Sequence, residues 1–265
     1  MVKQNKFSIG IFDSGVGGTS IWREINALLP NENTIYLADS KNAPYGEKSK
    51  QDIINLSIKN TEFLLKLNCK IIVVACNTAT TNAIDVLREK YNIPFIGIEP
   101  AIKPAALNTK SNTIGILATK GTLNSSLFEK TSKTINQKIT IKEIVGKGLV
   151  ELIENGKLDS KEMTALLSSY IIPLVKQNVD SLVLGCTHYP YLISQIRKIV
   201  GDKMQIIDSG EAVAKQTKAV LEKYQLINDK NKNSEHQFYI NKDKKVLEML
   251  ISNNHKKLTI YEMDF

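Results

Sequence analysis

The chain has 265 residues, of which 42% are hydrophobic and 23% charged, and it carries a net charge of +8 and only 3 cysteines. This composition excludes disordered, collagen-like and disulfide-stabilised proteins, and no apolar run approaches the roughly 20 residues of a membrane-spanning helix. We therefore expect two compact domains, a cytoplasmic protein with reduced thiols, and no membrane partner.

The positive charge is spread along the chain. Residues 1–110 contain 13 basic and 10 acidic residues, residues 111–200 contain 11 and 7, and residues 201–265 contain 11 and 10, which gives net charges of +3, +4 and +1. The only arginines are Arg23, Arg88 and Arg197, although arginine is the side chain that usually binds phosphates and reads bases. We therefore do not expect nucleic acid as a main partner.

Short apolar runs rich in Ile and Val alternate with amphipathic stretches from Ser8 to Ile207. Runs that are apolar on both faces, separated by helices, predict an α/β fold of mainly parallel sheets with helices on each side. In chain order we expect a strand at Ser8–Phe12, a helix at Ser20–Leu29, a strand at Thr34–Ala38, a helix at Lys50–Leu67, a strand at Ile71–Ala75, a helix at Ala79–Lys90, strands at Phe95–Ile98 and Thr113–Ala118, a helix at Leu123–Thr131, a strand at Ile139–Ile144, a helix at Lys161–Lys176, a strand at Ser181–Gly185, a helix at Tyr191–Val200 and a strand at Gln205–Ile207.

Landmarks of the sequence recur at nearly the same offset, which indicates an internal duplication. The run from Ile9 to Phe12 is echoed by the run from Ile114 to Leu117, and Cys76-Asn77-Thr78 is echoed at a similar distance along the chain by Cys186-Thr187-His188. We expect two similar lobes related by a pseudo-twofold axis, with the active site in the cleft between them. Residues 1–98 with 208–265 would form lobe one, and residues 99–207 would form lobe two.

The last part of the chain does not extend the repeat. After a helix at Glu211–Tyr224 and a polar linker at Asn228–Glu235, we expect a strand, a helix and a last strand. Because lobe two returns the chain to the junction near Asp208, this tail is expected to complete lobe one as an extra sheet edge.

The carboxyl ends of the strands carry the candidate functional residues, because ligands of open parallel sheets bind beyond those ends. Across a cleft, Cys76 and Cys186 would face each other from opposite lobes. A cysteine serves as a base when ionised and as an acid when protonated, and a helix N-terminus after each strand favours the thiolate. One thiol can then remove a proton from one face of a substrate carbon while the other delivers one to the opposite face, which inverts a stereocentre. The segments selected by this rule are Asp13-Ser14, Cys76-Asn77-Thr78, Ala118-Thr119 and Cys186-Thr187-His188.

Some of these residues and their neighbours have other interpretations. Cys69 precedes its strand without polar followers and is expected to be a packed core residue. The cysteines lack a CxxC partner, so no zinc or other metal site is expected. The Gly-rich run 15–18 follows a first strand as a phosphate loop does, but without the GxGxxG or Gly-Lys-Ser/Thr pattern it is expected to be a tight turn that presents Asp13 and Ser14. Asp13 read alone fits a helix N-cap as well as a ligand for an amino group.

Four motifs follow one another along the chain: Ile9 to Gly18, Ala38-Asp39 with Pro44-Tyr45-Gly46, Ala75 to Thr78, and Leu184 to Pro190. Together they resemble the glutamate racemases, within the aspartate/glutamate racemase superfamily, and the tail from Phe238-Tyr239 onward is similar to that family's tail. The resemblance implies a two-lobed isomerase that needs no cofactor and interconverts L- and D-glutamate. It also implies a supply of D-glutamate to peptidoglycan synthesis, and a homodimer.

The resemblance further implies roles for individual residues. Cys76 and Cys186 would be the two acid/bases, the first acting on D-glutamate and the second on L-glutamate. Asp13 and His188 would assist the adjacent proton transfers, and so would Glu154, for which Glu151 is a rival. The implied substrate-binding residues, which offer hydroxyls, amides and backbone N–H groups, are Asp13, Ser14, Tyr45, Gly46, Asn77, Thr78, Thr187 and His188, with Thr119 and Thr122 as further candidates.

Two alternatives stay open at this point. One is a related enzyme that acts on aspartate or another acidic compound, including a decarboxylase with a single cysteine. The other is a non-catalytic two-lobed module that binds small acids. His236 and His255, in the tail, are expected to be surface residues outside the site.

Overall fold

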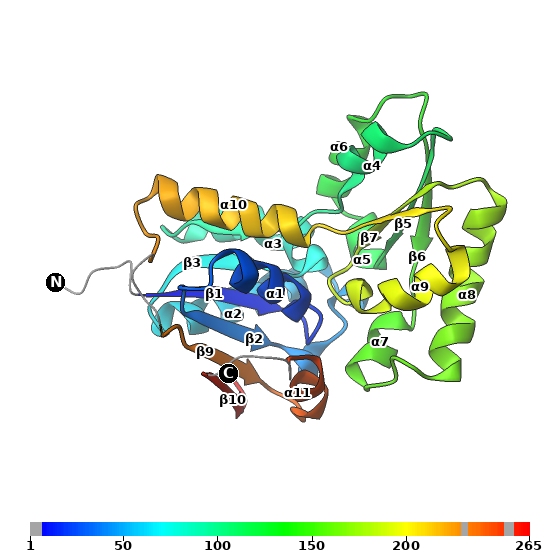
Figure 1. Ribbon diagram of the computed structural model, residues 1–265. Coiled ribbons are helices and arrows are strands. Elements are labelled where there is room, and N and C mark those ends of the chain that lie inside the picture. Colours follow the sequence, from blue (N-terminus) through cyan, green and yellow to red (C-terminus); the bar gives the residue numbers. More distant parts are fainter. Residues whose placement is uncertain (1–6, 229–232, 252–256) are drawn as a thin grey trace.

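The computed structural model describes residues 7–228, 233–251 and 257–265. These residues form two β-sheets with helices packed on both faces (Figure 1). Around the first sheet the elements are β1 (Ser8–Asp13), α1 (Thr19–Leu28), β2 (Thr34–Ala38), the 3-10 turns η2 (Ser40–Asn42) and η3 (Tyr45–Glu47), α2 (Lys50–Lys66), β3 (Cys69–Val74), α3 (Asn77–Lys90), β4 (Phe95–Gly97), α10 (Gly210–Lys223), β9 (His236–Ile240), α11 (Lys245–Ile251) and β10 (Leu258–Glu262).

The second sheet comes from the middle of the chain. Its elements are α4 (Ile102–Asn108), β5 (Thr113–Ala118), α5 (Lys120–Leu123), α6 (Ser126–Lys133), β6 (Thr140–Val145), α7 (Leu149–Glu154), α8 (Lys161–Lys176), β7 (Ser181–Gly185), the 3-10 turn η4 (Tyr189–Leu192), α9 (Ile193–Val200) and β8 (Gln205–Ile207).

Four neighbouring strands of the first sheet have the same order as the four strands of the second sheet. The first runs β10-β9-β2-β1-β3-β4 and the second β6-β5-β7-β8, and every strand pair among the described residues is parallel. The order β2-β1-β3-β4 therefore matches β6-β5-β7-β8 strand for strand, so β1 corresponds to β5 and β3 to β7. The predicted α/β class with parallel sheets and flanking helices is confirmed.

The tail lies where it was expected, at the edge of the first sheet. β9 pairs with β2, from Thr34 opposite His236 to Ala38 opposite Ile240, and β10 pairs with β9 at the outer edge. α10 packs against α1 (Figure 1). The boundaries of the two lobes, at residues 98 and 207, stay a prediction.

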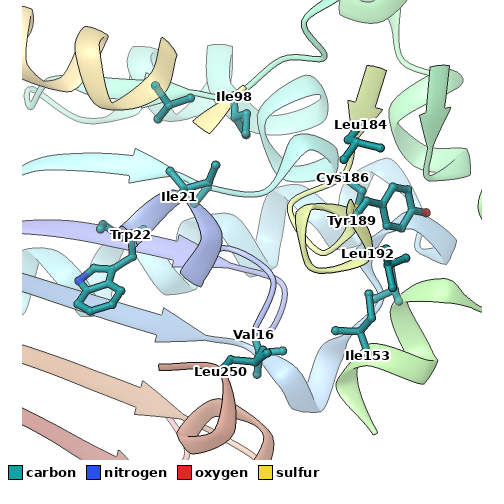
Figure 2. Close-up of a cluster of buried hydrophobic side chains, with 14 of the residues drawn as sticks. Val16, Ile21, Trp22, Ile98, Ile153, Leu184, Cys186, Tyr189, Leu192 and Leu250 are labelled. Atoms are coloured by element: carbon teal, nitrogen blue, oxygen red, sulfur yellow. The ribbon is translucent and has the colours of Figure 1, made fainter. Parts of the chain in front are cut away.

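The core follows the two-residue period of the strands, because successive side chains of a strand point to opposite faces of a sheet. Ile9 and Ile11 of β1 pack in the cluster that contains α1 and α10 residues, whereas Phe12 packs in the cluster that contains α2 and α3 residues. The first of these clusters continues into the second lobe, from Trp22 to Cys186 (Figure 2). One apolar cluster therefore contains side chains that pack on both sheets.

Several details differ from the sequence-based expectation. The helix expected at Leu123–Thr131 is two short helices, because Ser125 caps a new helix start by accepting a hydrogen bond from Phe128 N at 3.2 Å. α4 and α7 were not expected as helices, since each is shorter than two full turns and shows little periodicity. His236 is buried, against expectation, because its ring packs edge-on against Trp22 and its Nδ1 lies 2.9 Å from Thr34 Oγ1. His255 lies outside the described residues.

Candidate active site

Cys76 lies where β3 gives way to α3. It is the N-cap of that 14-residue helix, and its Sγ accepts a hydrogen bond from Ala79 N at 3.4 Å. Burial raises the pKa of the thiol well above its ordinary value, and the negative charge of Asp13 adds to the rise, while the Ala79 amide and the Ser14 hydroxyl oppose it. Burial and the charge of Asp13 therefore outweigh the stabilisation of a thiolate by the helix N-terminus. Cys76 is a protonated thiol in the resting state, which is the form that can deliver a proton.

Cys186 follows β7, the equivalent strand of the second sheet, and it is also buried. Unlike Cys76 it does not open a helix, because Thr187 and His188 separate it from the short turn η4. Its Sγ instead lies 3.7 Å from His188 Nδ1. The expected helix N-terminus is thus absent at Cys186, and an imidazole takes its place. The charge of Cys186 also contributes to the raised pKa of Cys76, so the two thiols lie close enough to interact.

His188 is held between a thiol and a carboxylate. Its Nε2 lies 2.6 Å from Glu154 Oε1, opposite the nitrogen that faces Cys186. Burial lowers the pKa of His188, but the hydrogen bonds and negative charges of Cys186 and Glu154 outweigh burial and raise the pKa well above its usual value. An imidazolium therefore lies beside Cys186, with Nδ1 3.7 Å from Sγ, where it can exchange a proton with the sulfur.

Asp13, the last residue of β1, is wholly buried. Its Oδ2 accepts a hydrogen bond from Gly15 N at 3.0 Å, and its Oδ1 accepts one from Thr187 Oγ1 at 3.1 Å, across the two lobes. Burial raises the pKa of Asp13 to about 6, the charge of Glu154 adds to this, and the charge of His188 opposes it. Asp13 can therefore exchange a proton near neutral pH.

Glu154 and its sequence rival Glu151 lie in different surroundings. Glu154, the last residue of α7, is buried, and besides facing His188 it accepts hydrogen bonds from Val16 N at 2.6 Å and from Ser40 Oγ at 2.8 Å. The Glu151 side chain is only half-buried and makes no hydrogen bond or ion pair with described residues. The N-cap of α7 is Gly148, whose φ of +84° favours glycine.

Threonines and backbone groups form the other side of the candidate site. Thr78 Oγ1 lies 2.7 Å from Thr119 Oγ1 and 3.3 Å from Thr122 Oγ1, so the hydroxyls of lobe one meet those of lobe two. Gly46 lies against the same group, since a Cβ added there would stand 2.7 Å from Thr119 Cβ. Asn77 is buried, and both polar atoms of its amide lack a hydrogen-bond partner among the described residues. A buried free amide is suited to hold a polar ligand.

Tyr45 is oriented differently from what a substrate-binding hydroxyl requires. Its hydroxyl donates to Asp39 Oδ2 at 2.5 Å and accepts a hydrogen bond from Asn60 Nδ2 at 3.1 Å. The phenol is therefore committed to the protein, and the backbone of Tyr45 is the part that is left for a ligand.

Sequence reasoning missed two residues that touch this network, Ser40 and Tyr36. Ser40 follows β2 and donates to Glu154, so the rule about carboxyl strand ends finds it when the rule is applied to β2 as well. Tyr36 lies inside β2 and its hydroxyl donates to Gly15 O at 2.7 Å, a contact that no sequence pattern signals.

The described residues show neither a metal cluster nor a membrane helix. Nowhere in 7–228, 233–251 and 257–265 do three or more His, Cys, Asp or Glu side chains come together as metal ligands. Within the same ranges, none of the helices combines the length and the apolar character required to cross a bilayer. The cysteines Cys69, Cys76 and Cys186 are all free, and Cys69 is buried in the core as expected.

Comparisons with known proteins identify relatives of this chain. The sequence profile of the family described as Asp/Glu/Hydantoin racemase matches residues 9–217. The chain is 44% identical over 216 residues to a glutamate racemase of Cupriavidus pinatubonensis, covering 82% of this chain and 79% of that protein.

Solved structures are similar over nearly the whole length. The structure of Escherichia coli glutamate racemase in complex with L-glutamate and the activator UDP-MurNAc-ala has a TM-score of 0.84 and 30% identity, covering 97% of this chain and 100% of that one. That of the Francisella tularensis glutamate racemase in complex with D-glutamate has a TM-score of 0.83 and 30% identity, covering 98% and 99%. The chain therefore belongs to the Asp/Glu/hydantoin racemase family of isomerases, and within it to the glutamate racemases.

Proposed function

We propose that this protein interconverts L- and D-glutamate by a two-base mechanism in which Cys76 and Cys186 act on opposite faces of the α-carbon. The observation that carries the proposal is the pair of buried thiols at the ends of the equivalent strands β3 and β7, each with its own proton partner. The charge of Asp13 acts on Cys76, and Cys186 faces the His188–Glu154 pair.

We propose for each thiol the direction that the resemblance to the glutamate racemases implies. With L-glutamate bound, the Cys186 thiolate takes the α-proton and becomes a thiol, and the electron pair stays on the substrate as a carbanion. The Cys76 thiol then gives its proton to the opposite face and becomes a thiolate, which completes D-glutamate. The reverse reaction exchanges the two roles. Asp13 and His188 return the thiols to their starting states by passing protons on the two sides.

Substrate binding is proposed for the polar groups around the thiols. The free amide of Asn77 offers a donor and an acceptor, and the hydroxyls of Ser14 and Thr78 offer donors for the two carboxylates. The Thr187 hydroxyl donates to Asp13, so it offers its oxygen as an acceptor for the ammonium group. Thr119 and Thr122 add to this set from lobe two. Gly46 and Tyr45 contribute backbone groups, since the Tyr45 hydroxyl is bound to Asp39. Every proton in this scheme moves between protein groups and substrate, so the chemistry calls for no cofactor.

The decisive experiment follows the α-proton. Incubation of the protein with L-glutamate in deuterated water is expected to place deuterium on the α-carbon and to bring the optical rotation to zero. Cys76→Ser and Cys186→Ser are each expected to slow racemisation by about 10²–10⁴-fold, the usual contribution of a positioned acid or base. Cys69→Ser is the matched control, since it alters a buried thiol outside the site and is expected to keep the activity.

The same assay separates the alternatives. Faster exchange with aspartate than with glutamate would make the protein a racemase of a different acid. No exchange with any acidic amino acid would leave a binding module and contradict the proposal.

The biological setting belongs to the same proposal. D-Glutamate made by this reaction would be supplied to peptidoglycan synthesis for the cell wall, in the cytoplasm, where free cysteines stay reduced. The homodimer is tested by sedimentation velocity: a single species of twice the chain mass is expected, and a monomer at micromolar concentration contradicts it.

A further inference from the structure

Three consecutive backbone amides contact three different acid–base groups of the site. Gly15 N donates to Asp13 Oδ2 at 3.0 Å, Val16 N donates to Glu154 Oε1 at 2.6 Å, and Gly17 N lies 3.2 Å from His188 Nε2. Asp13 ends β1, whereas Glu154 and His188 come from the second half of the structure. One short segment of the first lobe therefore holds groups on both sides of the site.

This segment lies in direct contact with the groups that it holds. A Cβ added at Gly15 would stand 1.9 Å from Glu154 Oε1, and one added at Gly17 would stand 2.1 Å from His188 Nδ1. No side chain fits at either position, so the two glycines allow the backbone to lie close to Glu154 and His188. Val16 between them is buried in the same apolar cluster as Leu250 (Figure 2).

The peptide between Gly15 and Val16 is bound at both of its polar ends. Its oxygen accepts a hydrogen bond from Tyr36 Oη at 2.7 Å, and its N–H donates to Glu154 Oε1. The oxygen and the hydrogen of a trans peptide lie in one rigid plane and point in opposite directions within it, so fixing the oxygen also orients the N–H. Donation to a peptide oxygen further polarises the N–H on the same peptide and strengthens its hydrogen bond.

Tyr36 is itself held rigidly. It is wholly buried on β2, next to Ile11 of β1 in the strand register. Its ring packs against Phe238 of β9 with ring centroids 5.5 Å apart, and Phe238 packs edge-on against Trp22 at 4.9 Å. The hydroxyl of Tyr36 is therefore fixed in position, and its hydrogen bond sets the orientation of the Gly15–Val16 peptide.

We propose that Tyr36 is a positioning residue for racemisation: through the Gly15–Val16 peptide it holds the Glu154 carboxylate against His188, and thereby holds the imidazole beside Cys186. This inference rests on the function proposed above. Tyr36 acts through Glu154 and His188, so its loss is expected to affect turnover more than substrate binding.

The amide of Gly17 gives His188 a partner in either protonation state. When Nε2 carries a proton, it donates to Glu154 Oε1 at 2.6 Å; when Nε2 has lost the proton, the Gly17 N–H can donate to it. A segment that shifts by a few tenths of an ångström would satisfy neither state well. The position of the segment, which Tyr36 sets, therefore bears on every proton transfer through His188.

The test compares two variants of the same strand. Tyr36→Phe removes one buried hydroxyl and keeps the ring that packs on Phe238. Thr34→Val, two residues earlier, also removes a buried hydroxyl, one that bonds Trp22 and His236 and not the 15–17 segment. Both are expected to lower Tm by about 2–4 °C, as the loss of one or two buried hydrogen bonds does in a protein of this size.

Steady-state kinetics are expected to distinguish the two variants. Tyr36→Phe should lower kcat by about 10–100-fold, the cost of misplacing a reacting group by a fraction of an ångström to an ångström, with little change in KM. Because the two enantiomers of glutamate have equal free energy, kcat/KM must fall equally in both directions. Thr34→Val should keep kcat within about twofold of the unaltered protein, as a change away from the site does.

The pH profile gives a second readout that a purely structural loss does not move. The charged groups facing His188 are Cys186, Glu154 and Asp13. If Tyr36→Phe loosens the Glu154 contact, the imidazolium is held less strongly, and the alkaline limb of kcat should move to lower pH. The Val16 amide should also exchange faster with deuterated water, which is measurable without any activity.

The outcomes are distinct. No exchange of the α-proton of glutamate by the unaltered protein would overturn the proposed function and this inference with it. An active protein in which Tyr36→Phe keeps kcat, the alkaline limb and the Val16 protection would overturn this inference alone. Equal losses of kcat in Tyr36→Phe and Thr34→Val would also overturn it, by making the effect a general one of stability.

Discussion

Gly17→Ala is the sharpest perturbation of the contact between the two lobes. The added Cβ would lie 2.1 Å from His188 Nδ1, 2.4 Å from Cγ and 2.5 Å from Cε1, which is within the imidazole ring. Ordinary van der Waals contact begins near 3.4 Å, so the ring and the Gly17 backbone must separate by more than an ångström. Both residues are buried, and neither can relax into solvent.

A displacement of this size breaks the contacts that orient His188. Once the ring has moved away, Nε2 no longer lies within hydrogen-bond distance of Glu154 Oε1, from which it now stands 2.6 Å. Misplacing a catalytic group by about 1 Å costs roughly 100-fold in rate, so we expect kcat to fall about 100-fold in both directions. Overpacking should also lower the free energy of unfolding by about 1–3 kcal/mol.

Circular dichroism of the glutamate solution measures racemisation from either enantiomer, and thermal unfolding measures the stability. Gly10→Ala is the matched control: its Cβ would meet Cys69 Sγ at 2.9 Å in the core of the same lobe, behind the site. It should lose a similar stability and keep kcat within about twofold. The reasoning is refuted if Gly17→Ala keeps its kcat, or if Gly10→Ala is equally inactive.

Three further predictions concern charged groups. Because burial raises the pKa of Asp13 from 3.8 to about 6, folding favours its protonated form, and the ionised carboxylate costs stability as the pH rises through 6. Asp13→Asn should therefore raise the free energy of unfolding by up to about 3 kcal/mol at pH 8 and by less below pH 5, while it impairs turnover. Urea unfolding that shows no increase in this free energy at pH 8 would contradict the prediction. Glu154→Gln should lower kcat by about 10–100-fold and Glu151→Gln by less than about twofold, and steady-state kinetics giving the reverse order would transfer the proposed role to Glu151. The Lys70 ammonium lies 2.5 Å from the Glu32 carboxylate, and Lys70→Met leaves that carboxylate buried without its cation. The substitution should therefore lower the free energy of unfolding by about 3–5 kcal/mol, and adding Glu32→Gln should recover most of the loss. A Lys70→Met protein as stable as the original would be inconsistent with a paired buried charge.

The elements of both sheets were largely predictable, because a parallel strand covered on both faces leaves a continuous apolar run in the sequence. The strands Thr34–Ala38, Thr113–Ala118, Ser181–Gly185 and Gln205–Ile207 have the predicted bounds. The short helices were less predictable, since only Asn124 and the capping Ser125 separate α5 from α6 within one amphipathic stretch.

The candidate site was predictable where it follows from strand ends and the internal repeat. Both features are local in sequence: polar residues directly after an apolar run, found at Cys76 and again, in the second copy of the repeat, at Cys186. The surroundings of these thiols were not local. A helix N-terminus was expected after each strand, and only Cys76 has one, while Cys186 has His188 in its place.

By itself, then, the sequence determined the α/β class, the internal duplication and the two cysteines at equivalent strand ends, because each depends on the period and order of nearby residues. Only the tertiary structure decided that Glu154, and not Glu151, faces His188, that His236 is buried, and that Tyr36 holds the Gly15–Val16 peptide. The bond from Val16 N to Glu154 joins residues 138 positions apart, and the contact of Gly17 with His188 joins residues 171 apart. Such contacts arise from the packing of two lobes against each other, and no periodicity within either lobe encodes which side chains meet there.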